Sequence, residues 1–126
     1  MCGITGISGD FEETFLKQST KILSHRGPDD DGIFVDNENQ IGLGHTRLSI
    51  IDLTDRAHQP MTSRDNNITI VFNGEIYNYE ILRSELQDDN FVFQSESDTE
   101  VILNLYARDG IEFLKKLRGI FGLAIF

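Results

Sequence analysis

The chain has 126 residues, of which 39% are hydrophobic, so it is long enough for one domain with a buried core. Its 21 acidic and 11 basic side chains give a formal net charge of −10, which argues against nucleic acid or an anionic membrane surface as the main partner. No apolar run approaches the roughly 18 residues that cross a bilayer, and the first residues lack the pattern of a signal peptide. The single cysteine cannot form an intrachain disulfide, so we expect a cytoplasmic location.

The first half of the chain is expected to consist mainly of short strands. Residues 2–7 are rich in Gly, Ile and Thr and predict a buried strand. Apolar residues at helical spacing follow from Phe11, and Pro28 requires that helix to end before it. The next expected elements are a loop at 26–32, strands at 33–35 and 41–45, an extended segment at 47–52 and a long loop at 53–66.

The second half begins with a predicted core strand at residues 67–72, which leads directly into Asn73 and Gly74. Ser97 stands three residues before Glu100, a capping-box pattern that predicts the start of a helix. The remaining expected elements are a helix at 78–87, a brief strand at 91–93, a helix from 97 to about 110, an amphipathic piece at 111–117 and an apolar strand at 119–126. Because short strand-turn-strand steps require antiparallel pairing, the fold class is expected to be α+β.

Metal binding is not predicted. His25, His45 and His58 share no zinc-ligand spacing with the sole cysteine, and the acidic residues 29–31 lack the alternating ligands of a calcium loop.

Cys2 is a candidate nucleophile because of its position. If the initiator Met1 is removed, Cys2 carries both a thiol and a free α-amine, and the amine can take the thiol proton directly or through one water. The alternative is a buried structural thiol near a chain end.

Three further segments favour the nucleophile over that alternative. The Asn73 carboxamide and the Gly74 N–H are two donors that could form an oxyanion hole, although Asn-Gly is also a common hairpin turn. Arg47 is a charge within an apolar run, where it could hold a carboxylate or pair with Asp52. Asp98 lies in a helix first turn, where it could receive an ammonium group or simply interact with the helix dipole. Together these groups predict an amino acid with an attackable side-chain carbonyl as ligand, and glutamine is the natural candidate.

Several motifs in this order resemble one family. They are Met-Cys-Gly-Ile at residues 1–4, His-Arg-Gly-Pro-Asp at 25–29, Gly-His-Thr-Arg-Leu-Ser-Ile at 44–50, Phe-Asn-Gly-Glu-Ile-Tyr-Asn at 72–78 and Ser-Asp-Thr-Glu at 97–100. The whole chain resembles the class II glutamine amidotransferase domain of glutamine-hydrolysing asparagine synthetases.

The resemblance implies an N-terminal-nucleophile hydrolase fold, an αββα sandwich of two antiparallel sheets between helix layers. It implies that Cys2 attacks the glutamine side-chain amide and releases ammonia, leaving a glutamyl thioester that is hydrolysed to glutamate. The implied catalytic residues are Cys2, Asn73 and Gly74, and the implied substrate-binding residues are Arg47, Ile50, Glu75, Asp98, Arg26 and Gly27.

The resemblance also raises an expectation about completeness. Family glutaminase domains are longer, so residues 1–126 are expected to be the N-terminal part of such a domain, truncated at the C-terminal end. The ATP-binding synthetase domain is absent from this chain, which is expected to hold no cofactor, whereas the missing domain is expected to use ATP and magnesium. Expected partners are L-glutamine and that synthetase domain, and a homo-oligomer is left open. The alternative function is an inactive fragment or paralogue that only binds glutamine or mediates assembly.

Overall fold

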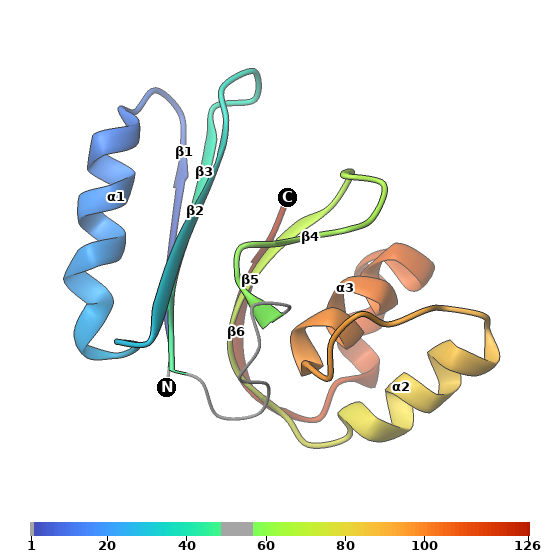
Figure 1. The fold of residues 1–126 in the computed structure, drawn as a ribbon. Coiled ribbons are helices and arrows are strands. Elements are labelled where there is room, and N and C mark those ends of the chain that lie inside the picture. Colours follow the sequence, from blue (N-terminus) through green and yellow to red (C-terminus); the bar gives the residue numbers. More distant parts are fainter. Residues whose placement is uncertain (1, 49–56) are drawn as a thin grey trace.

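A computed structural model describes residues 2–48 and 57–126 of the chain. The described residues form two three-stranded antiparallel sheets that lie face to face (Figure 1). The helices and strands, in chain order, are β1 (Gly3–Ser8), α1 (Glu13–Ile22), a 3-10 turn (Leu23–His25), β2 (Asp30–Asp36), β3 (Ile41–Arg47), β4 (Met61–Thr62), β5 (Thr69–Ile76), α2 (Tyr79–Asp88), α3 (Asp98–Asp109), a second 3-10 segment (Gly110–Lys116) and β6 (Gly119–Ile125).

The first sheet has the order β1-β3-β2 and is covered on its outer face by α1. Glycines in β3 let the helix approach closely, because a Cβ at Gly42 would overlap Leu16, and one at Gly44 would overlap the Thr20 hydroxyl. Leu16 and Thr20 are the buried residues of α1. Since alternate residues of a strand face opposite sides, His45 and Arg47 of β3 lie on the inner face of this sheet, toward the second sheet.

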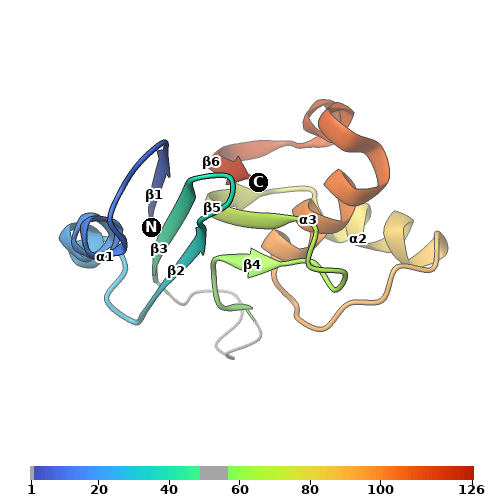
Figure 2. The ribbon, with the colours of Figure 1, turned by 90° about the horizontal axis from the view of Figure 1, so that it is seen from above.

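The second sheet has the order β4-β5-β6, and α2 and α3 pack on its outer face. Ile70, Phe72 and Ile76 of β5 enter the main hydrophobic core with these helices. The other core members include Leu82, Leu86, Val101, Ile102, Leu105 and Phe113. The alternate residues of β5, Asn73 and Glu75, therefore lie on the inner face. Figure 2 shows the resulting four layers from above: α1, the first sheet, the second sheet, and the α2–α3 layer.

The predicted α+β class and the αββα sandwich are confirmed, and the predicted helices and most strands lie where the sequence indicates. Residues 91–93 are the exception, since they form no strand. Phe91 and Phe93 pack against the core cluster, and the Phe91 N–H donates to the Leu86 carbonyl at the end of α2 (2.9 Å). Phe91 and Phe93 therefore belong to a loop that packs against the core, and this packing explains why they are apolar.

Other bounds also differ from the prediction. The core strand expected at 67–72 is β5, which runs from Thr69 to Ile76, and most of the extended segment expected at 47–52 lies outside the described residues. The first strand of the expected 33–35 and 41–45 pair begins earlier, at Asp30, where it pairs with Arg47 of β3. Within the expected loop at 53–66, Met61 and Thr62 form the short strand β4 beside Ile70 and Thr69. Among the described residues, no helix is long and apolar enough to span a membrane.

Candidate active site

A cavity of about 320 Å³ is lined by the Cys2 and Arg47 ends of the first sheet, by β5 and by the start of α3. Its walls bring together residues that are far apart in sequence: Cys2, Arg47, Leu48, Ala57, Gln59, Phe72, Asn73, Gly74, Glu75, Tyr77, Ser97, Asp98, Thr99 and Ile120. This volume is within the range of small-molecule sites in proteins. Six of the nine residues predicted for the site line it: Cys2, Arg47, Asn73, Gly74, Glu75 and Asp98.

Cys2 is half-buried and precedes the first residue of β1. The Leu48 N–H donates to its Sγ at 3.4 Å, which anchors the sulfur beside the end of β3. Arg26 holds the other side of the residue, because its Nε donates to the Cys2 carbonyl oxygen at 3.1 Å. The thiol therefore sits at a fixed position on the cavity wall.

The donor edge of β5 follows from strand alternation. Thr69 and Phe126 exchange both backbone hydrogen bonds, so the N–H groups of Val71, Asn73 and Glu75 point to β6 and those of Phe72, Gly74 and Ile76 point to the opposite edge. The short β4 covers that edge only at Thr69 and Ile70. Beyond it, side chains accept the hydrogen bonds: Gln59 Oε1 from Phe72 N–H (2.6 Å) and Asp98 Oδ2 from Ile76 N–H (3.3 Å).

The Gly74 N–H lies between those two donors on the same edge, and Gly74 lines the cavity. A side chain at this position would overlap the backbone of Ile120 and Phe121 in β6, so glycine is needed for the two strands to approach. The hairpin-turn alternative for Asn73 and Gly74 is wrong, because both residues lie within β5, opposite Gly122 and Phe121 of β6.

Asn73 lies on the inner face of the sheet and lines the cavity together with the next residue, Gly74. Its Oδ1 is buried and has no hydrogen-bond partner among the described residues. A buried carboxamide oxygen without a donor is unusual in a folded protein, whereas the group that would donate to an oxyanion is the Nδ2 amide of the same side chain.

Arg47 and Asp98 place opposite charges in the cavity wall. Arg47 ends β3 and is 8% exposed, whereas Asp98 begins α3 and is 6% exposed. Burial raises the pKa of Asp98, although backbone N–H groups of Ile76 and Thr99 lower it, and the charge of nearby Glu75 adds to the increase. Burial therefore disfavours the carboxylate form of Asp98 in the free protein. A cation bound beside Asp98 would stabilise that form.

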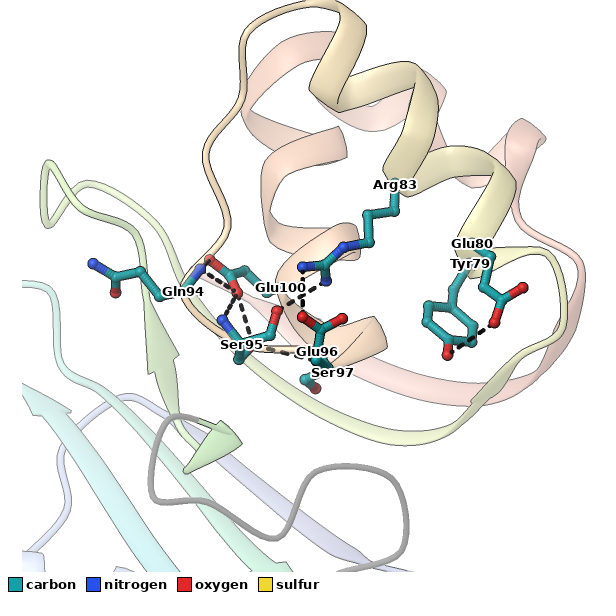
Figure 3. A network of polar contacts seen from close by, with 8 residues as sticks. All are labelled: Tyr79, Glu80, Arg83, Gln94, Ser95, Glu96, Ser97 and Glu100. Carbon is teal, nitrogen blue, oxygen red and sulfur yellow. Dashed lines mark hydrogen bonds and ion pairs between the residues drawn. The ribbon is translucent and has the colours of Figure 1, made fainter.

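The loop before α3 is held by the network in Figure 3. Ser97 caps the helix, because its Oγ accepts from the Thr99 N–H (3.1 Å). The expected reciprocal bond from the Ser97 N–H to Glu100 is replaced, because the Glu100 carboxylate accepts from the N–H groups of Gln94 and Ser95 and from the Ser95 hydroxyl (2.7–3.1 Å). Arg83 donates to the Ser95 carbonyl (2.8 Å) from α2. These hydrogen bonds hold the residues immediately before Asp98 and so fix the position of Asp98 at the start of α3.

Two predicted substrate-binding residues, Arg26 and Gly27, are not on the cavity wall. A third, Ile50, lies outside the described residues, as does Asp52, the alternative partner of Arg47. Arg26 donates a hydrogen bond to the Cys2 carbonyl oxygen. Gly27 packs closely on the backbone of Thr46 and Arg47, and a Cβ at Gly27 would overlap that backbone. In the structure Arg26 and Gly27 support the wall and do not line it.

Two buried polar side chains at the site are not among the predicted site residues. Gln59 is 6% exposed and lines the cavity, whereas His45 does not line it but contacts Phe72, which does. His45 is 1% exposed, and its Nε2 lies 3.2 Å from the Phe72 carbonyl oxygen. Burial lowers the pKa of His45 to about 4, so the ring is neutral near pH 7 and its Nε2–H donates to that carbonyl. Among the described residues, no group of three or more His, Cys, Asp or Glu side chains could hold a metal ion.

Comparison with known proteins agrees with this geometry. A family model described as a glutamine amidotransferase domain matches residues 1–126. The chain belongs to this family. Asparagine synthetase [glutamine-hydrolyzing] 1 of Bacillus subtilis is 41% identical over 132 residues, which cover 99% of this chain and 20% of that protein. Asparagine synthetase B [glutamine-hydrolyzing] of Escherichia coli is 42% identical over 131 residues, covering 100% of this chain and 23% of that protein.

Not every similar protein is named as a synthetase. Amidase chry2 of Gibberella zeae is 36% identical over 139 residues, covering 99% of this chain and 21% of that protein. The structure of glutamine phosphoribosylpyrophosphate amidotransferase from Bacillus subtilis superimposes with a TM-score of 0.83 at 22% identity, covering 98% of this chain and 34% of that one. The glutamine amidotransferase domain therefore has the predicted N-terminal-nucleophile fold, and it spans about a fifth to a quarter of the curated relatives compared here.

Proposed function

We propose that this glutamine amidotransferase domain hydrolyses the side-chain amide of L-glutamine. The observation that carries the proposal is the meeting, in one cavity, of Cys2, the inward-facing Asn73 with the adjacent Gly74, and two buried opposite charges, Arg47 and Asp98. An α-amino acid carries a carboxylate and an ammonium group on one carbon, which complement those two charges. Arg47 binds the carboxylate, Asp98 and the exposed Glu75 bind the ammonium, and the side-chain amide extends toward Cys2.

The reaction follows from these positions. Once Met1 has been removed, the α-amine of Cys2 takes the thiol proton, and Sγ bonds to the amide carbon. The Asn73 carboxamide and the Gly74 N–H donate to the resulting oxyanion. The C–N bond breaks, the nitrogen takes the proton and leaves as ammonia, and a glutamyl thioester remains. Water then attacks the thioester carbon, which releases glutamate and restores the thiol.

The fate of the ammonia is proposed from the relatives. Asparagine synthetases align with the whole chain, so the ammonia serves ATP-dependent amidation, with aspartate converted to asparagine in a synthetase domain outside residues 1–126. That domain, and not the cavity described here, uses the ATP and magnesium. A cytoplasmic location fits a mechanism that requires Cys2 as a free thiol.

Release of glutamate from L-glutamine, measured in a coupled assay, tests this function. We expect turnover of L-glutamine and none of a simple amide of similar length that lacks the α-carboxylate and α-ammonium groups. Equal turnover of both amides would contradict the assigned roles of Arg47 and Asp98.

Replacing Arg47 with lysine should raise the KM for glutamine roughly tenfold while kcat changes little. Lysine keeps the positive charge but loses the planar fork that binds a carboxylate with two hydrogen bonds. Arg118→Lys, at an exposed position, is the matched control. Steady-state kinetics give the result, and an unchanged KM in Arg47→Lys would assign Arg47 a structural role.

Replacing Asp98 with asparagine should make the unliganded protein more stable at pH 7 and weaken glutamine binding roughly 10- to 100-fold, the range expected for losing a hydrogen bond to a charged group. Because the folded-state pKa of Asp98 is raised, its ionisation costs the folded state free energy above the unfolded pKa of about 3.9. Below that pH the carboxyl is protonated in both states, so the gain in stability should disappear.

Thermal unfolding from pH 3 to 8 measures that pH dependence. Asp31→Asn makes the same chemical change at an exposed position and serves as the control. A lower melting temperature for Asp98→Asn at pH 7 would show that the carboxylate stabilises the free protein and is not held ready for a cation.

A further inference from the structure

The Gln59 side chain connects the two halves of the cavity. Its Oε1 accepts from the Phe72 N–H of β5 at 2.6 Å, and its Nε2 donates to the Thr99 hydroxyl of α3 at 3.1 Å. The orientation of the carboxamide is unambiguous, because the Phe72 N–H can only donate and must face the oxygen. Gln59 and Thr99 are 6% and 1% exposed, so neither hydrogen bond competes freely with water.

The Phe72 peptide groups are held on the open edge of β5. Gln59 takes the N–H, and His45 of the first sheet donates to the carbonyl oxygen. Because β4 pairs only with Thr69 and Ile70, no strand within residues 2–48 or 57–126 pairs with β5 on this edge at Phe72. The Gln59 and His45 side chains therefore form the hydrogen bonds to Phe72 that a neighbouring strand forms elsewhere in the sheet. Asn73 and Gly74 are the next two residues of β5.

We propose that Gln59 is a positioning residue that sets the oxyanion donors of Asn73 and Gly74 relative to the Asp98 end of α3. The inference rests on the proposed glutamine hydrolysis. Gln59 contacts Phe72, which precedes Asn73, and Thr99, which follows Asp98. Its carboxamide therefore links the segment that holds the proposed oxyanion donors to the segment that holds the proposed ammonium-binding carboxylate. A bound glutamine must reach both groups at once, and a displacement of a catalytic donor by about 1 Å can cost roughly a hundred-fold in rate.

Loss of the Gln59 side-chain amide would leave the Phe72 N–H without its acceptor. Without the Gln59 oxygen, the Phe72 N–H is buried with no acceptor, and the edge of β5 can relax only by moving the adjacent Asn73 and Gly74. Oxyanion donors act mainly in the transition state, so their displacement should lower kcat more than it raises KM. Cys2 lies on the opposite sheet, and its contacts with Leu48 and Arg26 do not involve Gln59.

Gln59→Met in the full chain tests the inference, with Gln87→Met on the exposed surface of α2 as the matched control. We expect kcat for glutamine hydrolysis to fall about 10- to 100-fold, KM to change less than about threefold, and the rate of Cys2 alkylation by iodoacetamide to stay within about twofold. Alkylation requires an accessible thiol but no oxyanion hole, so it separates a misplaced donor from a disordered site.

A double-mutant cycle with Asn73→Ala supplies the second readout. If Gln59 acts through the donors, Gln59→Met should cost much less in the Asn73→Ala background than in the parent chain. Thr99→Ser keeps the hydroxyl that accepts from Gln59, whereas Thr99→Val removes it in the same shape, so the serine variant should retain more of kcat than the valine variant.

An unchanged kcat in Gln59→Met, a strictly additive cycle, or a loss of alkylation in proportion to kcat would each overturn the positioning role. A parent chain that is processed at Met1 and hydrolyses no glutamine would instead overturn the proposed function, so the two failures are distinguishable.

Discussion

Replacement of Cys2 with alanine should lower glutamine hydrolysis by roughly 10⁴-fold or more, as expected when a covalent nucleophile is removed. In the proposed reaction the Cys2 sulfur bonds to the amide carbon before ammonia leaves and is released again when water attacks the thioester, and no other cysteine is present in the sequence. The side chain makes few contacts, the main one being the hydrogen bond from the Leu48 N–H, so alanine should leave the fold intact.

Binding separates loss of chemistry from loss of the site in that variant. Calorimetry should show that Cys2→Ala still binds glutamine, because Arg47 and Asp98 are unchanged. Cys2→Ser is the second variant, and it should also be severely impaired because a hydroxyl is a weaker nucleophile than a thiol. Turnover by Cys2→Ala within tenfold of the parent chain would exclude Cys2 as the nucleophile.

Replacement of Asn73 with alanine has the next largest expected effect, a fall in kcat of about 100-fold or more. Asn73 and Gly74 line the cavity, and a hydrogen bond to the oxyanion strengthens as charge develops on the oxygen. KM should therefore change much less than kcat. Removing the amide also removes the buried, unpartnered Oδ1, so stability should not fall sharply.

Steady-state kinetics on Asn73→Ala and on Asn37→Ala, an exposed asparagine in the β2–β3 turn, make the comparison. A normal kcat in Asn73→Ala would leave Asn73 as an ordinary strand residue. A large rise in KM with normal kcat would indicate that it binds the ground state.

The β5 edge explains why the sequence predicts part of this site and misses the rest. Asn-Gly is a local turn signal, yet Asn73 and Gly74 continue a strand, because pairing with Gly122 and Phe121 some fifty positions later overrides the local preference. Residue type alone suggests the proposed role of Asn73 and Gly74 as oxyanion donors. Their place on an uncovered strand edge could not be predicted, since it depends on β4 being only two residues long.

Gln59 and His45 show the same limit more strongly. Gln59 lies in a stretch without hydrophobic periodicity, and its partners Phe72 and Thr99 are 13 and 40 positions away. His45 looked like a histidine without a metal-ligand pattern, and its contact with Phe72 joins two sheets. Neither contact can be predicted from the residues next to it in sequence. The helix start at Ser97 can be predicted in that way, because a helix cap is a local interaction.

The central claim is that Cys2, freed of Met1, is the nucleophile for a glutamine amide. Intact-mass measurement before and after incubation with a glutamine-like diazoketone, followed by peptide mapping, tests it most directly. The claim predicts a chain that lacks Met1, gains one label on Cys2, and is protected from labelling by glutamine. A chain that retains Met1 and still hydrolyses glutamine, or a processed chain that gains no label on Cys2, would contradict it.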